Sequence, residues 1–321
     1  MAARNAATGP NTHGGYVNTK QRILGLLTLL LLLAGMAAPM ADAAKPKRDR
    51  GDNQERVWGG NDNSQSGIYH VVSIGTNNPY TTDKARRNHR CSGTLLTRTK
   101  VLSAAHCFSG TDVQNPTTLR VRASVGSWAD MDAGLGQTRT VSSIVKHGLY
   151  VNGSFDYDVA ILTVSTAFPA EYLALKWPVI GSGQTQHYAE GGDYYLYGWG
   201  QDEGAYASDP NQSASSTGLR TATLTGKSDT ALAASMGTSF KSNLMFGAGG
   251  MYPQKNACIG DSGAPLTALI QPETGLSYEA IVGVVSHGEK RQCPYLDGEA
   301  TIFTKLAQSN IRQFILNFAG V

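Results

Sequence analysis

A serine flanked by glycines occupies a short segment that could form a nucleophilic site. The segment reads Cys258-Ile-Gly-Asp-Ser-Gly-Ala-Pro265. A serine hydroxyl attacks a carbonyl carbon only when a base takes its proton and donors hold the resulting oxyanion. A tight glycine turn can expose Ser262 and direct the N–H groups of Gly260 and Ser262 to one side. An ordinary β-turn uses the same residue types, so this segment alone leaves both interpretations open.

Two other segments supply a candidate base and a candidate carboxylate. In Leu102-Ser-Ala-Ala-His-Cys107, small residues lead to His106. An imidazole, whose ordinary pKa is about 6.5, suits proton transfer from a serine and back to a leaving group. In Asp158-Val-Ala-Ile-Leu162, a carboxylate at the head of an apolar strand could orient that imidazole. A core histidine and a strand-capping aspartate are the alternatives, and Asp156 competes with Asp158 for the role.

The composition favours an all-β globular fold. The 321-residue chain holds 37 glycines, with 16% charged and 41% hydrophobic residues. A turn-rich chain of low charge suits strands better than helices. The formal net charge is only +3, and no basic cluster is interleaved with aromatic residues. Nucleic-acid binding is therefore not indicated.

Short apolar runs separated by turn residues follow one another after residue 57. They predict the strands of a sandwich or a barrel. The runs are 68–74, 94–97, 100–103, 119–125, 159–164, 194–197, 219–224, 280–285 and 300–303. A helix is expected only at the end of the chain, where Ile311, Phe314, Ile315 and Phe318 recur at helical spacing.

The first part of the chain has the features of an export signal. Lys20 and Arg22 precede an apolar run from Ile23 to Met36, and Ala41-Asp-Ala43 has the small-x-small pattern of signal-peptidase sites. We expect residues 1–43 to be a cleaved signal peptide and the protein to be secreted, either extracellular or periplasmic. A signal anchor is the alternative, although the run is short for a span of about 20 residues.

A polar segment from Lys45 to Arg56 comes next and is almost without apolar side chains. Such a segment cannot bury enough surface to offset the entropy lost on ordering, so it predicts a flexible linker. Its last residue, Arg56, is accessible to a trypsin-like processing enzyme.

The chain contains four cysteines, at positions 91, 107, 258 and 293. An exported chain meets an oxidising compartment, so we expect disulfides. Four cysteines allow three pairings, and their spacing does not choose among them. A zinc site is less favoured because no C-x₂-C spacing occurs.

Seven short motifs occur in one order along the chain. They are Val57-Trp-Gly-Gly60, Ser103-Ala-Ala-His-Cys107, Asp158-Val-Ala-Ile-Leu162, Gly198-Trp-Gly200, Gly260-Asp-Ser-Gly263, Val285-Ser-His-Gly288 and Phe303-Thr-Lys305. In this order they resemble the chymotrypsin/trypsin-like serine proteases over residues 57–321. The resemblance implies two antiparallel six-stranded β-barrels with a C-terminal α-helix, and a serine endopeptidase that forms an acyl-enzyme. It gives His106 and Asp158 to the first barrel and Ser262 to the second as a catalytic triad. The N–H groups of Gly260 and Ser262 would form the oxyanion hole.

The resemblance also selects one cysteine pairing. Cys91 should pair with Cys107 and close a loop around His106. Cys258 should pair with Cys293 beside the substrate pocket.

The resemblance further implies a zymogen. Residues 44–56 would be an activation propeptide, and cleavage after Arg56 would leave residues 57–321 as the protease domain. The new α-amino group of Val57 should pair with Asp261 and order the oxyanion turn. A buried carboxylate without a partner is strongly unfavourable, so the turn should be disordered before cleavage.

The resemblance aligns several residues with the substrate side-chain pocket. They are Asn256, Ala257, Ser286, Gly288 and Thr301. Specificity for arginine or lysine usually needs an aspartate where Asn256 stands, because a buried cation needs a counter-charge. Thr301 should fill part of the pocket base, so we expect a medium-sized apolar or polar residue before the cut bond. Asp297 or Glu299 would supply an acid if the alignment is shifted.

His287 stands where the family commonly has a tryptophan against which the substrate backbone packs. Substrate binding is therefore expected to be weaker or sensitive to pH. The stretch from Gly126 to Gln137 has none of the glutamates of the family's calcium loop. No metal and no cofactor is expected.

The expected partners are protein or peptide substrates and an activating protease, because an enzyme that rejects arginine cannot efficiently cut after its own Arg56. No nucleic acid is expected, and no membrane after signal removal. A non-catalytic homologue that acts as a binding or regulatory module is the main alternative. An esterase is disfavoured, since no Gly-x-Ser-x-Gly elbow occurs.

Overall fold

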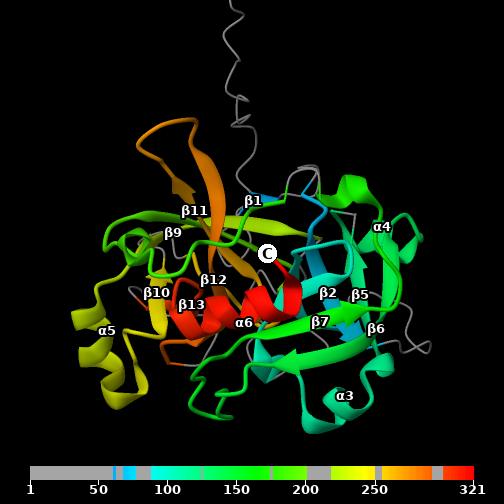
Figure 1. Ribbon diagram of the computed structural model, residues 1–321, viewed down its shortest axis with the longest axis horizontal. Helices are drawn as coiled ribbons and strands as arrows, with labels where there is room; N and C mark the ends of the chain where they lie inside the picture. The colour runs from blue at the N-terminus through cyan, green and yellow to red at the C-terminus, as the bar shows by residue number, and fades with distance from the viewer. Residues whose placement is uncertain are drawn as a thin grey trace, which may run out of the picture. The chain divides into compact units, whose positions relative to one another are not determined.

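Two antiparallel β-barrels make up the part of the chain that carries the predicted motifs (Figure 1). The computed structural model describes residues 61–62, 68–76, 88–123, 126–173, 176–200, 218–249, 255–290 and 299–321. The predicted signal peptide and propeptide lie outside these residues.

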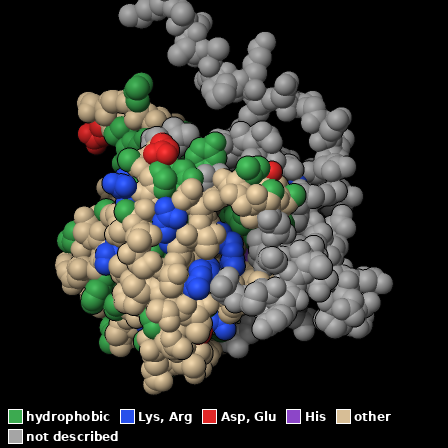
Figure 2. Space-filling model, turned by 90° about the vertical axis from the view of Figure 1, so that its right-hand side faces the viewer, with side chains coloured by type: hydrophobic (Ala, Val, Ile, Leu, Met, Phe, Trp, Pro, Cys, Tyr) green, Lys and Arg blue, Asp and Glu red, His purple; other side chains and the backbone are tan. Residues whose placement is uncertain are grey.

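The first barrel is closed by six strands in the order β2-β3-β4-β7-β6-β5. The strands are β2 (Val71–Thr76), β3 (His89–Leu95), β4 (Lys100–Ser103), β5 (Leu119–Ala123), β6 (Gln137–Lys146) and β7 (Ala160–Val164). Aliphatic residues of alternating position fill its interior, and Ile74, Val121 and Leu162 are completely buried. Figure 2 shows one outer face of the described chain, where Lys and Arg side chains lie near the middle and hydrophobic ones mainly at the edges.

The second barrel follows in the sequence. Its strands are β8 (Asp193–Gly198), β9 (Arg220–Gly226), β10 (Met245–Gly249), β11 (Pro265–Ile270), β12 (Tyr278–Gly288) and β13 (Thr301–Lys305). They pair in the order β9-β10-β13-β12-β11-β8, and a β9–β8 pairing closes the ring. The short strand β1 (Asn61–Asp62) adds to the outside of β9.

The fold class implied by the resemblance is thus confirmed, including a C-terminal helix. Helix α6 (Ser309–Ala319) buries Ile311, Phe314 and Ile315 and ends at Gly320, whose φ of 74° is left-handed. Phe318, which the helical spacing also singled out, is 42% exposed.

The expectation of a helix only at the C-terminus was wrong. Helices α3 (Gly110–Gln114), α4 (Trp128–Asp132) and α5 (Asp229–Met236) also form. Each begins at a serine whose side chain accepts a backbone N–H of the first turn: Ser109, Ser127 and Ser228. These helices are too short for an apolar period to be recognised, so the caps were the available signal.

Among the described residues, no helix combines the length and the apolar character that a membrane crossing requires.

Candidate active site

The pairing of β4 with β7 brings His106 and Asp158 together. His106 lies in the 3₁₀ turn η1 (Ala105–Cys107) just after β4, and Asp158 comes just before β7. Because Ser103 at the end of β4 pairs with Ala160 at the start of β7, the two flanking residues become neighbours. His106 Nδ1 lies 2.7 Å from Asp158 Oδ2, and the His106 backbone N–H donates to Oδ1 at 2.8 Å.

Asp158 is completely buried, and its carboxylate accepts a further hydrogen bond from the second barrel. The hydroxyl of Ser286 donates to Oδ2 at 2.5 Å, while Thr304 Oγ1 donates to the backbone carbonyl of Asp158 at 3.0 Å. Several donors on one carboxylate offset the cost of burying it. The competing candidate Asp156 instead pairs with Lys241.

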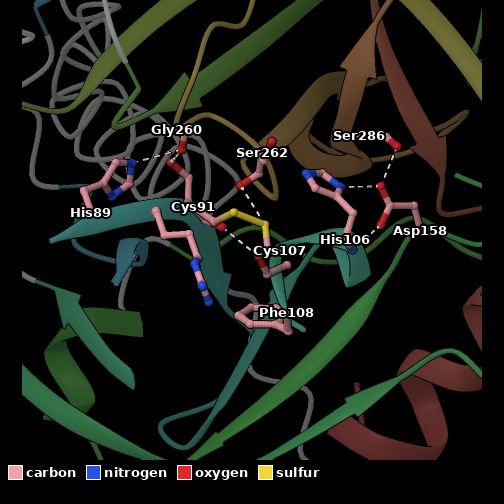
Figure 3. The surroundings of a disulfide bond; sticks show 12 residues. His89, Cys91, His106, Cys107, Phe108, Asp158, Gly260, Ser262 and Ser286 are labelled. Atoms are coloured by element: carbon pink, nitrogen blue, oxygen red, sulfur yellow. Dashed lines mark hydrogen bonds and ion pairs between the residues drawn. A yellow bond between two sulfur atoms is a disulfide. The ribbon is translucent and has the colours of Figure 1, made fainter. Parts of the chain in front are cut away.

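Ser262 lies on the turn that leads into β11. In Figure 3 its hydroxyl points toward the imidazole of His106, on the side away from Asp158. Cys107 Sγ lies 3.8 Å from Ser262 O, and Ser92 N donates to Ser262 O at 2.8 Å, so the turn contacts the first barrel directly. No hydrogen bond joins Ser262 Oγ to His106 in the described structure, as is common for such groups without substrate.

The backbone of the turn has the conformation that its glycines allow. Gly260 has a φ of 96° and Gly263 a φ of 83°, which side-chain-bearing residues rarely adopt. A Cβ added at Gly260 would lie 2.8 Å from His89 Nε2. Within the described residues, neither the Gly260 nor the Ser262 N–H donates an intramolecular hydrogen bond. Both amides are therefore available to an oxyanion.

The carbonyl of Gly260 is held from the other side by the first barrel. His89 Nε2 and Ser92 Oγ each lie 3.0 Å from Gly260 O. Because a carbonyl only accepts, His89 carries its proton on Nε2, and its Nδ1 accepts from Ser73 Oγ at 2.8 Å. Burial lowers the pKa of His89 to about 4, so the ring is neutral at ordinary pH.

Asp261 is completely buried beside this turn. Its Oδ1 accepts the Gly200 N–H and its Oδ2 the Cys258 N–H, both at 2.8 Å. A Cβ at Gly198 would lie 1.9 Å from Oδ1, and one at Gly200 would lie 2.5 Å from Cγ. The two glycines of the Gly198-Trp-Gly200 motif thus make room for the carboxylate. Val57, whose α-amino group is expected to pair with Asp261, lies outside the described residues, as does Arg56, the expected cleavage residue.

Two residues predicted to form the base of the pocket bond to one another. Thr301 Oγ1 donates to Asn256 Oδ1 at 3.2 Å and accepts the Ala257 N–H at 2.9 Å. Asn256 Nδ2 donates to the backbone carbonyl of Glu299 at 3.2 Å. Asn256 and Thr301 are completely buried, and Gly288 pairs with Thr301 across β12 and β13.

Of the two acids considered as substitutes for an aspartate at the base, only Glu299 lies in the described structure, and its carboxylate is not bonded to Asn256. The carboxylate of Glu299 pairs with Lys290 at 2.7 Å, so this residue turns only its backbone carbonyl to Asn256. Asp297 lies outside the described residues.

The predicted disulfide between Cys91 and Cys107 is confirmed. It joins β3 to the turn that carries His106 (Figure 3). Cys258 is also in a disulfide, while Cys293, its expected partner, lies outside the described residues.

Three residues at this site were missed from the sequence or seen in another role. His89 holds the Gly260 carbonyl from 171 residues away, and Ser286, expected in the pocket, also bonds to Asp158. Phe155 contacts His106 edge-on with ring centroids 5.6 Å apart. His287 stacks on the same Phe155 ring, with ring centroids 4.4 Å apart. No local sequence pattern signals such contacts.

One group of potential metal ligands occurs among the described residues, and it consists of Cys91, His106 and Cys107. The two sulfurs are joined in a disulfide, so they offer no thiolate to a metal ion.

The chain is similar to known proteins over much of its length. The family model described as Trypsin matches residues 59–311. Transmembrane protease serine 7 of Homo sapiens is 29% identical over 211 residues, which are 66% of this chain and 23% of that protein. Trypsin-1 of Astacus astacus is 29% identical over 205 residues, covering 62% of this chain and 77% of that protein. Trypsin Tyr p 3.0101 of Tyrophagus putrescentiae is 28% identical over 236 residues, covering 72% and 73% respectively. The chain spans less than a quarter of the transmembrane protease.

Proposed function

Because the chain belongs to the trypsin family of serine proteases, we propose that it is a serine endopeptidase whose catalytic triad is His106, Asp158 and Ser262. The observation that carries the proposal is the buried carboxylate of Asp158, which bonds to both the ring and the backbone N–H of His106. That contact fixes the proton on Nδ1 and leaves Nε2 as the basic nitrogen on the side of Ser262.

The proposed reaction has two halves. In the first, His106 Nε2 takes the Ser262 proton as Oγ attacks the peptide carbonyl carbon, and the oxyanion is held by the N–H groups of Gly260 and Ser262. His106 then gives this proton to the leaving amine nitrogen, the C–N bond breaks, and an acyl-enzyme remains.

In the second half, water attacks the acyl carbon and gives its proton to His106. The ester bond to Ser262 breaks, His106 returns the proton to Oγ, and the acid product leaves. Asp158 stays ionised throughout and stabilises the imidazolium that forms in each half.

Hydrolysis of a peptide library by the mature form that begins at Val57 tests this function. We expect cleavage that disappears in the Ser262→Ala variant, with the variant otherwise folded as judged by circular dichroism. A wild-type protein that binds peptides without cutting them would favour the non-catalytic homologue instead.

We further propose that the residue before the cut bond is apolar or neutral and of medium size. The mutual hydrogen bonds of Asn256 and Thr301 support this, because they use the polar groups of two uncharged side chains, and neither side chain offers a counter-charge to a cation. A panel of fluorogenic peptides should show little cleavage after arginine or lysine. A strong preference for arginine would overturn this part of the proposal.

Activation by cleavage after Arg56 is proposed as well, with residues 44–56 as propeptide and 57–321 as the protease domain. The close packing of the Asp261 carboxylate against Gly198 and Gly200 supports a role for this carboxylate in ordering the turn. Arg56→Gln should leave the chain uncut and inactive, whereas full activity of that uncut variant would refute the activation step.

Incubation of the purified precursor alone tests the need for a separate activator. We expect no new Val57 terminus unless a trypsin-like protease is added. Residues 1–43 are proposed to direct export, and a signal anchor is the alternative to secretion, in line with the relatives that are named transmembrane proteases.

A further inference from the structure

Two histidines contact the same phenyl ring at the active site. His287 stacks on Phe155 with an interplanar angle of 21°, and His106 meets Phe155 at 82°. Phe155 itself has a positive φ of 59°, a conformation that side-chain-bearing residues rarely adopt. The second histidine is therefore close enough to act on the first electrostatically.

A chain of hydrogen bonds also joins the two histidines. Ser286 Oγ lies 2.5 Å from Asp158 Oδ2 and 3.1 Å from His287 Nδ1. A hydroxyl has one proton to donate, and an ionised carboxylate can only accept, so the Ser286 proton points to Asp158. Toward His287 the hydroxyl must then accept, which places the His287 proton on Nδ1. His106 Nδ1 donates to the same Oδ2 from the opposite end.

The Asp158 carboxylate is thus linked to both imidazoles, directly to His106 and through Ser286 to His287. When His287 is neutral, its Nδ1–H fixes the Ser286 hydroxyl in the orientation that supports Asp158. When His287 takes up a proton on Nε2, a positive charge is added beside the carboxylate that must stabilise His106 in its charged form. The two like charges oppose one another, and the reaction requires His106 to become charged.

We propose that His287 is a positioning residue that supports the His106–Asp158 pair through Ser286 when neutral and slows attack by Ser262 when protonated. The proposal rests on the function proposed above, since it describes regulation of that same site.

Among the described residues, the charged groups next to His287 and Phe155 in the sequence have partners of their own. Asp156 pairs with Lys241, Glu289, which follows β12, accepts the Ala300 N–H at 3.0 Å, and Lys290 pairs with Glu299. On the neighbouring strand β13, the residue opposite His287 is the uncharged Ile302. Within the described residues, a hydrogen-bond chain runs from His287 through Ser286 to Asp158, and His106 contacts the same Phe155 ring as His287.

Two substitutions separate the donor of His287 from its charge. His287→Asn keeps an N–H donor near the position of Nδ1 but cannot ionise. His287→Phe keeps an aromatic ring against Phe155 but has neither donor nor charge. His187→Gln, in the 3₁₀ turn η4 (Thr185–His187) of the second barrel, is the matched control.

The measurement is the rate at which a small fluorophosphonate labels Ser262 between pH 4.5 and 9, together with kcat and KM on a peptide substrate. As the pH is lowered, we expect the labelling rate of the wild type to fall more steeply than the uptake of a single proton allows. The labelling rates of both His287 variants should fall with the slope of a single protonation. At pH 8 the Asn variant should keep a higher kcat than the Phe variant, because only Asn retains a donor to Ser286, and the Phe variant should lose about fivefold in kcat. His187→Gln should match wild type.

Identical acid limbs in the wild type and both His287 variants would overturn the proposal. Wild-type protein that has been cut after Arg56 and is still not labelled at any pH would instead refute the proposed function.

A second readout does not depend on catalysis or on the stability of one variant. In Ser262→Ala protein, nuclear magnetic resonance follows the titration of the His106 ring protons. Replacing His287 by Asn should raise the titration midpoint of His106, because a neighbouring positive charge is removed. An unchanged midpoint would contradict the coupling of the two histidines.

Discussion

At the scale of single residues, the side chains of the proposed triad could be singled out because each lies in a distinctive local segment. Ser262 lies between Gly260 and Gly263, which both have positive φ values. Glycine is the residue type expected at such positions, so the sequence itself signals the turn. His106 follows the last residue of β4 and Asp158 precedes the first residue of β7, and these two strands pair antiparallel. The order of the motifs implied that the two residues lie together.

Residues that act through distant contacts could not be predicted in the same way. His89 lies 171 residues from Gly260, and nothing near it in the sequence marks it as a partner of the oxyanion turn. The side chains that support a site are chosen by packing, so they become visible only when both barrels are placed.

His89 provides a prediction at this scale. His89→Phe should lower kcat about five- to tenfold, because the Gly260 carbonyl loses one of its two donors while Ser92 keeps the other. Steady-state kinetics on a peptide substrate measure this change. A variant with unchanged kcat would show that the turn keeps its shape without the imidazole.

His70 makes stability depend on pH. Its ring is 1% exposed, packs edge-on against Trp177, and has neither nitrogen hydrogen-bonded within the described structure. Burial lowers its pKa from 6.5 to about 4. Below pH 6.5 the unfolded chain binds a proton that the folded chain does not, so the free energy of unfolding falls as the pH falls toward 4.

The expected loss from His70 over that range is about 3 kcal/mol, with no further change below pH 4. His70→Phe should remove this part of the pH dependence. Urea denaturation of both proteins at several pH values between 4 and 8 measures the difference. Parallel curves for wild type and variant would contradict the assignment to His70.

At the scale of elements, the strands with clear apolar runs were predicted and the others were not. Strand β4 was predicted with its observed bounds, Lys100–Ser103. Strand β6 (Gln137–Lys146) is largely polar and partly exposed, β10 (Met245–Gly249) contains two glycines, and β11 (Pro265–Ile270) begins with proline. These three follow pairing with neighbours rather than intrinsic preference. Helix α5 buries only Leu232, so it has no apolar stripe to recognise.

The Gly198-Trp-Gly200 segment at the end of β8 gives a prediction for an element. Gly200→Ala would place a methyl group 2.5 Å from the Asp261 carboxyl carbon, and no flexible side chain can yield there. We expect activity to fall more than about tenfold and the protein to be destabilised by about 1–3 kcal/mol, as for other overpacked sites.

Gly110→Ala is the matched control for this substitution, since nothing lies within 4 Å of the added methyl group. It should leave the activity unchanged and the free energy of unfolding within about 0.5 kcal/mol of wild type, as at other open surface positions. Equal effects of the two substitutions would show that contact with Asp261 does not matter.

At the scale of the whole molecule, the site depends on direct contacts between the barrels. Ser92 N donates to Ser262 O at 2.8 Å, and Trp199 Nε1 donates to Val71 O at 3.1 Å. Strand patterns predicted a barrel or a sandwich, but the two-barrel arrangement followed from the order of the motifs. Periodicity within a strand does not encode which distant strand it pairs with.

The measurement that tests the central claim most directly is labelling of the form cut after Arg56 by a fluorophosphonate, with the adduct located by mass spectrometry. We predict one adduct, on Ser262, with labelling slowed at least about a thousandfold in His106→Ala, because the hydroxyl then has no base. An adduct on another residue, or labelling of His106→Ala at the wild-type rate, would contradict the account.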